Sequence, residues 1–352
     1  MPKELICVAK ETLAWREYDE PELKPGQVRV ASEFAAAKHG TEMAFYKGYA
    51  HPRGRFDAQL GAYDPTPAGD PYGPRGFGVG NMTVGPVVEV GPEATSLAEG
   101  DRVLIYGGFR QTHVRPAEAC WKLPPELSWK SAVCLDPADF ALGAVRDGHV
   151  RVGDAVAVLG MGAIGLMVVQ IARVAGACPV IASEPVAVRR ELAGRLGADV
   201  VLDSHACDVG LEIRKATAGR GADVVIDYSG SVDAMGDALR GVAYGGTVVS
   251  GSFPPPYAAG LDFGAEAHLN TPTLVFSRAC SVPNRDAPRW DEPRIWATCL
   301  RLLAEGRIGG EQIVRPVVPF EDLPSVYPRI PSDLEALIKL GAEFGGGAGE
   351  RT

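Results

Sequence analysis

The sequence has 352 residues, of which 46% are hydrophobic and 22% are charged, a length and composition that suit two globular domains. Its net charge of −9 and the lack of any run of Lys and Arg argue against binding to nucleic acid or to an anionic membrane, because both require a basic surface. No stretch approaches about 18 uninterrupted apolar residues and the N-terminus has no apolar signal core, so we expect a cytoplasmic protein.

The first third of the chain is predicted to be rich in short β-strands, at residues 27–32, 83–90 and 102–106. Residues 48–80 differ from it, because they are dense in Gly, Pro, Tyr and Asp and show little periodicity. We expect a long ordered loop near a pocket there, with a disordered insertion as the alternative. Residues 127–147 are predicted to form a helical connector.

The next segment has the order strand, glycine-rich loop, helix, strand. An apolar strand is predicted at residues 155–159, a helix at 164–175 and a second strand at 179–182. A glycine triplet lies between the first strand and the helix, and a glutamate follows the second strand. This order is the context that a dinucleotide-binding fingerprint requires.

Each glycine of the triplet meets a separate steric requirement. Gly160 permits the tight turn off the strand, and Gly162 has no side chain to keep a pyrophosphate from the backbone N–H groups. Gly165 lets the helix pack closely, and the free N–H groups at the helix N-terminus attract phosphates. The segment therefore predicts a bound dinucleotide.

The identity of that dinucleotide depends on Glu184. A carboxylate there can accept both ribose hydroxyls and would repel a 2′-phosphate, which favours NAD over NADP, although Arg189 and Arg190 lie close enough to receive a phosphate. The residues expected to contact the cofactor are Gly160, Gly162, Ala163, Ile164, Gly165, Glu184, Arg189, Ser229, Gly251 and Phe276.

Helices and strands continue to alternate after Glu184. Strands are predicted at residues 200–202, 222–227, 246–251 and 274–276, separated by helices at 188–196, 208–217 and 233–240. Together with the two earlier strands they give the six parallel strands of a doubly wound sheet. Beyond Ser277 we expect a loop, a helix at 294–305 and strands at 313–319 and 336–340.

Seven short motifs, in register, carry a family resemblance. They are Pro25-Gly26-Gln27-Val28, Gly40-Thr41-Glu42, Val87-Val88-Glu89-Val90-Gly91, Gly100-Asp101-Arg102-Val103, the loop from Gly160 to Gly165, Leu196-Gly197-Ala198-Asp199 and Gly245-Gly246-Thr247. With them the chain resembles the medium-chain dehydrogenase/reductase superfamily over nearly its whole length.

The resemblance implies an α/β architecture. A GroES-like β-barrel catalytic domain would be built from residues 1–148 and 280–352, and a doubly wound Rossmann domain that binds NAD would occupy residues 149–279. It also implies a homodimer or homotetramer that pairs through the strand at 274–276. The short motifs around Gly40 and Gly80 resemble those of the branch that contains bacteriochlorophyllide a dehydrogenase and similar sugar or secondary-alcohol dehydrogenases.

The positions that correspond to the family's catalytic zinc ligands are altered. Zinc-dependent members use a Cys, a His-Glu pair and a carboxylate or Cys, where this chain has His39, Asn81-Met82 and Asp136. Because Asn is a poor zinc ligand, we expect a zinc-free site. The alternative is a remodelled metal site of His39, Asp136 and a third ligand such as His51, His113 or Glu42.

Without a metal, side chains must remove the hydroxyl proton and hold the developing alkoxide. The candidates that the resemblance places near the nicotinamide are Lys38, His39, Thr41 and Asp136. His39 is favoured as the base, and Lys38 is the alternative; if both continue a strand, only one reaches the pocket. Thr41 would relay protons or cap a turn, and Asp136 would orient His39, bind a substrate hydroxyl or cap a helix.

Asn81, Arg278 and Trp290 are the candidate substrate-binding residues. A mixture of aromatic and hydrogen-bonding groups suits a sugar or polyol, although the arginines suit a carboxylate or phosphate equally. We therefore expect hydride transfer between a secondary alcohol, as the small-molecule alcohol or carbonyl substrate, and NAD. The alternatives are an NAD(P)H-dependent enoyl or quinone reductase, an epimerase or lyase that oxidises its substrate transiently, and a non-catalytic nucleotide sensor.

Overall fold

The computed structural model describes residues 1–50, 54–64 and 72–345, and the chain divides into two compact units. Unit 1 consists of Met1–Val133 and Val314–Thr352, and unit 2 of Cys134–Ile313. The expected boundaries at 148/149 and 279/280 therefore fall at 133/134 and 313/314 instead. The reason is that α3 (Leu135–Asp147) packs against both α4 (Ala163–Ala175) and α9 (Glu292–Ala304), so that α3 and α9 belong to unit 2.

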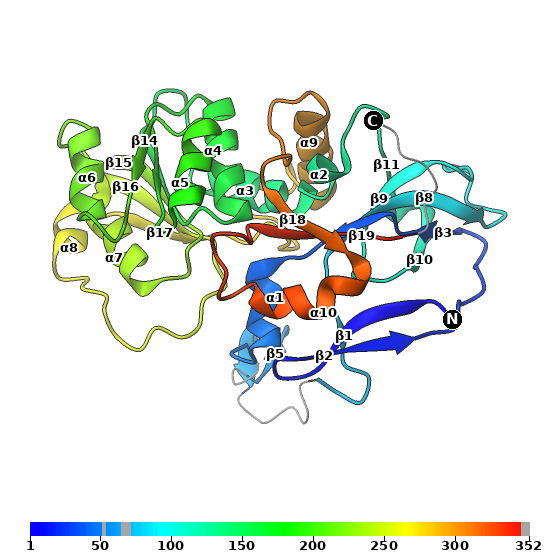
Figure 1. Cartoon of the computed structure of the whole chain (residues 1–352). Coiled ribbons are helices and arrows are strands. Elements are labelled where there is room, and N and C mark those ends of the chain that lie inside the picture. The colour runs from blue at the N-terminus through cyan, green and yellow to red at the C-terminus, as the bar shows by residue number, and fades with distance from the viewer. Residues whose placement is uncertain (51–53, 65–71, 346–352) are drawn as a thin grey trace. The chain divides into compact units, whose positions relative to one another are not determined.

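Unit 1 is mainly antiparallel β-structure (Figure 1). Its largest sheet has the strand order β10-β3-β8-β4-β19-β18, and β9 pairs with both β8 and β11. These strands are β3 (Gln27–Ala31), β4 (Phe34–Ala36), β8 (Met82–Val90), β9 (Arg102–Tyr106), β10 (Thr112–Pro116), β11 (Trp121–Lys122), β18 (Val314–Pro319) and β19 (Lys339–Glu343). The pairing of β4 with β19 joins the two ends of the chain in one sheet.

The shorter elements of unit 1 correct two expectations. A second sheet contains β2 (Thr12–Glu17), β1 (Lys3–Ala9) and β7 (Phe77–Gly78), and a hairpin joins β5 (Arg55–Asp57) to β6 (Ala62–Asp64). Residues 48–80 thus contain three short strands and are not one long loop, although residues 51–53 and 65–71 lie outside the described residues. The connector at 127–147 is two helices, α2 (Trp129–Ala132) and α3, because residues 133 and 134 interrupt it.

The last strand also differs from the expectation of residues 336–340, since β19 begins only at Lys339. The preceding residues form a turn in which the carboxylate of Asp333 accepts a hydrogen bond from the N–H of Ala336, and its backbone carbonyl accepts one from the N–H of Leu337. A side chain that accepts from nearby N–H groups competes with strand pairing. The turn therefore delays the strand by three residues.

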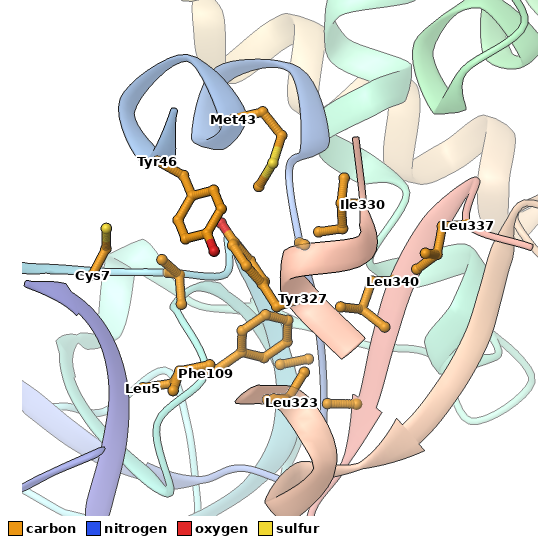
Figure 2. Packing of buried hydrophobic residues seen from close by; sticks show 14 of the residues in the cluster. Leu5, Cys7, Met43, Tyr46, Phe109, Leu323, Tyr327, Ile330, Leu337 and Leu340 are labelled. Carbon is orange, nitrogen blue, oxygen red and sulfur yellow. The ribbon is translucent and has the colours of Figure 1, made fainter. Parts of the chain in front are cut away.

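The core of unit 1 combines both ends of the chain. Figure 2 shows Tyr46, from α1 (His39–Tyr46), beside Tyr327, which follows α10 (Leu323–Val326), with ring centroids 5.5 Å apart and an edge-on angle of 80°. Leu5, Phe109 and Leu340 are buried in the same cluster. This packing fixes α1, which contains the candidate catalytic residues His39 and Thr41, against the C-terminal segment.

Unit 2 is a doubly wound α/β structure, and its sheet confirms the six predicted parallel strands. The strand order is β14-β13-β12-β15-β16-β17 (Figure 1). The strands are β12 (Val156–Leu159), β13 (Val180–Ser183), β14 (Val200–Leu202), β15 (Ala222–Asp227), β16 (Val242–Ser250) and β17 (Thr273–Phe276). The remaining helices are α5 (Ala187–Arg195), α6 (Val209–Ala216), α7 (Val232–Gly241) and α8 (Glu266–Asn270).

The order of this sheet reverses at β12, which is followed by β13 on one side and flanked by β15 on the other. Ligands of open α/β sheets bind beyond the carboxyl ends of the strands at such a point. Within the described ranges, no helix is long and apolar enough to cross a membrane.

Candidate active site

The loop that follows β12 shows why its glycines are needed. Gly160 has a φ of 88°, and a Cβ atom there would lie 2.7 Å from the backbone of Ser229. At Gly165 a Cβ atom would lie 1.9 Å from the carbonyl oxygen of Gly160, so the helix can approach the loop only without a side chain. At Gly162 a Cβ atom would meet nothing within 4 Å. Gly162 is therefore the glycine that the fold itself does not require, which is the pattern expected where a ligand approaches the backbone.

The N-terminus of α4 is available to an anion. Gly162 is its N-cap residue and makes no side-chain capping hydrogen bond, and the first turn contains no acidic residue. The first N–H groups of a helix have no partner inside the helix and carry a partial positive charge. The backbone of Gly162, Ala163 and Ile164 therefore fits a pyrophosphate group.

Glu184 has a position that sequence analysis did not foresee. Its buried carboxylate accepts a hydrogen bond from the N–H of Met161, at 2.6 Å, and another from the N–H of Val186, at 3.2 Å. Glu184 thus ties the glycine loop to the turn after β13. Arg190 donates to the backbone carbonyl of Glu184 at 3.0 Å and pairs with Asp203 at 2.7 Å, while Arg189 is buried.

Buried polar groups also line the carboxyl edge of the other half of the sheet. Asp227, at the end of β15, accepts from the N–H and hydroxyl of Ser229 at 2.8 and 2.6 Å, and its burial raises its pKa. Its second carboxylate oxygen and the hydroxyls of Ser252 and Ser277 have no hydrogen-bond partner among the described residues. Buried polar groups without partners at this edge would fit a ligand that supplies hydrogen bonds to them.

Gly251 and Phe276, the last two residues predicted to contact the cofactor, differ in their surroundings. A Cβ atom at Gly251 would lie 2.4 Å from the ring of Tyr228, so Gly251 makes room for that ring. The Tyr228 hydroxyl in turn donates to the carbonyl oxygen of Phe140 at 2.9 Å. Phe276, by contrast, lies at the end of the edge strand β17 and is 71% exposed.

In unit 1, Lys38 and His39 do not continue a strand, because β4 ends at Ala36 and α1 begins at His39 with Lys38 as its N-cap residue. Glu42 organises this turn. Its carboxylate accepts from the N–H of Lys38, from the N–H of Gly80 at 2.9 Å and from the hydroxyl of Tyr327 at 2.6 Å. The condition of the alternation argument, that Lys38 and His39 continue a strand, is therefore not met.

The strand β19 supplies two further contacts to this turn. Nε2 of His39 accepts a hydrogen bond from the N–H of Leu340 at 2.8 Å. An imidazole that accepts at Nε2 is neutral and carries its proton on Nδ1. Lys339, which is 2% exposed, donates from Nζ to the carbonyl oxygen of Ala37 at 2.8 Å. The sequence singled out Glu42 as part of a family motif and as a possible metal ligand, but it gave no signal for Lys339 or Leu340, because their contacts depend on the fold.

Of the other catalytic candidates, Thr41 lies in the first turn of α1 and belongs to unit 1 with Lys38 and His39. Asp136 belongs to unit 2, where it is buried in the first turn of α3. A carboxylate at that point is favoured by the partial positive charge of the helix N-terminus.

The substrate candidates are also divided between the units. The backbone of Asn81 is fixed by its N–H, which donates to Ala36, and by its carbonyl, which accepts from Gly107, both at 2.9 Å. Its side-chain Nδ2 is buried without a hydrogen-bond partner within the described part of the chain. In unit 2, Arg278 is exposed, whereas the ring of Trp290 is covered by the guanidinium groups of Arg146, at 3.7 Å, and Arg294, at 4.3 Å.

The residues at the positions of the family's catalytic zinc ligands differ from the usual zinc donors. Nε2 of His39 accepts a hydrogen bond from a backbone N–H. The positions of the family's His-Glu pair hold the amide of Asn81 and the buried thioether of Met82. Among residues 1–50, 54–64 and 72–345, no three His, Cys, Asp or Glu side chains are grouped so that they could hold a metal ion. His51, one of the possible third ligands, lies outside the described residues.

Comparisons with known proteins agree with this architecture. Residues 163–284 match the family model described as zinc-binding dehydrogenase. The chain is 43% identical over 350 residues to D-guloside 3-dehydrogenase of Escherichia coli K12, covering 97% of this chain and all of the relative. It is 29% identical to L-threonine 3-dehydrogenase of Pyrococcus abyssi, over 67% of this chain and 73% of the relative.

Solved structures show the same fold at lower identity. An E. coli oxidoreductase/dehydrogenase of unknown specificity superposes with a TM-score of 0.79 at 20% identity, over 98% of this chain and all of the other. The 2R,3R-butanediol dehydrogenase of Bacillus subtilis gives a TM-score of 0.78 at 22% identity, over 97% and 99%. The chain therefore belongs to the zinc-binding medium-chain dehydrogenase family, and it is a dehydrogenase with an antiparallel β catalytic domain and a six-stranded Rossmann domain.

Proposed function

We propose that this enzyme oxidises a secondary hydroxyl group of a glycoside, sugar or polyol and transfers the hydride to NAD without a catalytic zinc ion. The observation that carries the proposal is the 43% identity, over 97% of the chain, to a D-guloside 3-dehydrogenase. That relative supports the sugar substrate expected from the sequence over a bacteriochlorophyllide. The altered ligand positions, His39, Asn81 and Met82, support the absence of zinc.

The residues of unit 2 fit NAD. The N–H groups of Gly162, Ala163 and Ile164 would bind the pyrophosphate, and Gly160 and Gly165 would shape the loop. Each oxygen of the Glu184 carboxylate accepts one backbone N–H and has a further lone pair for a ribose hydroxyl. Its negative charge disfavours the 2′-phosphate of NADP. A bound NAD would supply the acceptor for the hydride.

The carboxyl edge of β15, β16 and β17 would receive the rest of the cofactor. Ser229, Gly251 and Phe276 follow or end these strands, so we assign them to the nicotinamide half. We assign Arg189, a buried residue of α5, which follows β13, to the adenosine half beside Glu184.

The chemistry at the substrate then depends on unit 1. Because Nε2 of His39 is bonded to the N–H of Leu340, we assign His39 the role of a hydrogen-bond donor, through Nδ1, to the substrate oxygen. Lys38 then takes the hydroxyl proton, and the Thr41 hydroxyl relays it toward solvent. Asn81 and Asp136 would hold substrate hydroxyls, and Arg278 and Trp290 would border the substrate.

The association expected from the sequence is also proposed. β17 is the edge strand of the Rossmann sheet, and Leu274 and Phe276 are exposed on it. We expect two copies to pair along this strand, as a homodimer or as half of a homotetramer.

The proposed function is tested by NAD reduction. We expect the purified enzyme, prepared without a His-tag, to reduce NAD with methyl gulosides, free sugars or polyols, and to prefer NAD to NADP by kcat/KM. Substitution of Glu184 by Gln should reduce that preference, because it removes the charge that opposes the 2′-phosphate. Metal analysis on the same sample should find no zinc.

Two outcomes would contradict the proposal. A tightly bound zinc ion, about one per chain, would overturn the zinc-free site. Turnover with enones or quinones and none with any sugar or polyol would overturn the reaction class.

A further inference from the structure

Unit 1 contains a cavity of about 390 Å³ whose wall comes from β1, from Pro21, from residues 78–80 and from residues between 108 and 115. Small-molecule sites in proteins begin at about this volume. None of the residues proposed above for catalysis, for the cofactor or for the substrate lines it. A molecule held in this cavity would therefore be separate from the reacting hydroxyl group.

The apolar part of the wall is held by backbone hydrogen bonds. Leu5, Val79 and Phe109 line the cavity and are at most 1% exposed. The N–H of Leu5 donates to the carbonyl oxygen of Phe109 at 2.9 Å, and the N–H of Phe109 donates to that of Val79 at 2.7 Å. The N–H of Val79 donates back to Leu5 at 3.3 Å. The three segments of the wall are thus tied to one another, and their polar side chains start from a fixed backbone.

The wall contains one carboxylate, and its charge is already paired. Glu4 is buried, and its Oε1 accepts from Nη2 of Arg16 at 2.9 Å, while its Oε2 accepts from Nη1 of Arg110 at 3.3 Å. Arg110 also donates from Nε to the carbonyl oxygen of Thr112 at 2.8 Å. Its Nη2 makes no hydrogen bond within the described part of the chain and is not one of the buried atoms that lack a partner. This Nη2 is therefore accessible.

Arg115 is the cation of this wall that has no counter-ion. Its Nε donates to the carbonyl oxygen of Tyr106 at 3.0 Å and its Nη1 to that of Val114 at 2.9 Å, and no carboxylate of the described residues pairs with it. Arg115 is half-buried, and its Nη2, like that of Arg110, has no partner and is not enclosed. A cation withdrawn from water is costly unless an opposite charge pairs with it.

The titratable groups around Arg115 do not supply that opposite charge. Burial, and after it the charge of Arg110, lower the pKa of Arg115. Burial, and after it the charges of Arg115 and Arg110, lower the pKa of His113 in the same wall to about 3, so this ring is neutral near pH 7. Burial raises the pKa of the Cys120 thiol to about 11, so the thiol is neutral as well. The two arginines would therefore repel a cation and attract an anion.

We propose that this cavity binds a small molecule through an oxyanion, a carboxylate or phosphate group, that accepts hydrogen bonds from Nη2 of Arg115 and Nη2 of Arg110. Guanidinium groups form strong, charge-assisted hydrogen bonds with both kinds of oxyanion. Both guanidinium groups are held by their other hydrogen bonds, so the ligand does not have to order them. The site goes beyond the proposed function, because it does not depend on which alcohol the enzyme oxidises.

The test is isothermal titration of three probes in a phosphate-free buffer of low ionic strength, with and without saturating NADH. The probes are D-glycerate, which carries a carboxylate, sn-glycerol 3-phosphate, which carries a phosphate, and glycerol, which carries neither. We expect at least one of the two anions to bind the wild type equally well with and without NADH, and glycerol to bind at least about tenfold more weakly. The tighter anion identifies the ligand group. Loss of anion binding in NADH would place the anion at the N-terminus of α4 and overturn the inference.

Substitutions of the two arginines test their part in binding. Arg115→Gln should weaken binding of the anion about tenfold, as expected for a lost charge-assisted hydrogen bond, and Arg115→Lys should weaken it less. Arg110→Gln should weaken it in the same direction, and it tests the site even if Arg115→Gln does not fold. The control is Arg214→Gln in unit 2, where the guanidinium also donates to two backbone carbonyls, those of Arg240 and Val242, at 2.8 and 2.9 Å. It should bind the anion as the wild type does.

Thermal unfolding without ligand shows which variants are folded, and the anion should raise the unfolding temperature of the wild type. If neither anion binds the wild type, or if the folded variants among Arg115→Gln and Arg110→Gln bind it as tightly as the wild type, the inference is wrong. These outcomes are independent of the NAD reduction assay, so the site and the proposed function can fail separately.

Discussion

Single hydrogen bonds decide the chemistry of the turn at residues 38–42. Glu42 joins the start of α1 to Gly80 and to Tyr327, a residue 285 positions later in the chain. Burial raises the pKa of Tyr327 well above its usual value, so its hydroxyl stays protonated and donates to the carboxylate. Three donors thus converge on one side chain that has no donor of its own.

Replacement of Glu42 by Gln should destabilise unit 1 by about 1–3 kcal/mol, because the amide would place N–H groups against donors. Tyr327→Phe removes only one of the three bonds and should cost about 1 kcal/mol. Thermal or urea unfolding of the two variants measures the difference. If Tyr327→Phe costs as much as Glu42→Gln, the bonds to Lys38 and Gly80 contribute nothing and Glu42 does not organise the turn.

Lys38 and His39 are distinguished by conservative substitutions. Lys38→Ala should lower kcat by about 10²–10³-fold with unchanged NAD affinity, and Lys38→Arg should be equally slow because Arg keeps its proton. His39→Gln should retain more activity, since Gln can still accept from the N–H of Leu340 and donate to the substrate. Steady-state kinetics over a range of pH shows which of the two residues is the base. A fully active Lys38→Arg variant, or a His39→Gln variant as slow as Lys38→Ala, would return the base role to His39.

At the scale of one element, the loop between β12 and α4 separates residues that the fold needs from those that a ligand needs. Gly165 contacts the Gly160 carbonyl so closely that any side chain must displace the loop, whereas the space at Gly162 is open. The same loop is held from outside by the bond from Met161 to Glu184.

This separation predicts opposite effects for two Gly→Ala substitutions. Gly162→Ala should leave the unfolding temperature within about 2 °C of the wild type, a shift equivalent to roughly 0.5 kcal/mol or less, and weaken NADH binding strongly, because its methyl group would occupy the space of the pyrophosphate. Gly165→Ala should lower the unfolding temperature and NADH affinity together. Differential scanning fluorimetry and NADH fluorescence titration on matched samples give both quantities. Normal NADH binding by Gly162→Ala would show that the pyrophosphate does not contact this loop.

At the scale of the whole molecule, unit 1 is assembled from both ends of the chain and unit 2 from its middle. Unit 2 presents an edge of its parallel sheet at β17, where the large apolar side chains of Leu274 and Phe276 are exposed. Such an edge is a template for pairing with another strand.

The association along β17 predicts that wild-type protein elutes with at least twice the chain mass of 37.1 kDa. Leu274→Glu should shift it to the mass of one chain, because a two-fold axis would bring the two carboxylates close together. Size-exclusion chromatography with light scattering measures this. Val152→Glu, at another exposed apolar residue of unit 2, is the control and should not change the mass. A wild-type monomer would contradict the association.

The sequence predicted the Rossmann half of the molecule almost completely. All six parallel strands were located within a few residues, because their short apolar runs alternate with helices along the chain. The boundaries of the units were missed because α3 and α9 join unit 2 by packing, which has no local signal. The start of β19 was missed because the Asp333 turn competes with the strand.

The candidate site also has one part that the sequence predicted and another that only the tertiary structure shows. The glycine triplet and Glu184 could be proposed as cofactor residues from the sequence alone, because they lie within one contiguous segment whose pattern is local. The tertiary structure alone decided that Nε2 of His39 is taken by Leu340, 301 residues away, and that Glu42 meets Tyr327. It alone placed His113 in a cavity wall beside Gly107. The protonation and hydrogen-bonding of a side chain depend on neighbours brought together by folding, and those neighbours leave no pattern in the chain around it.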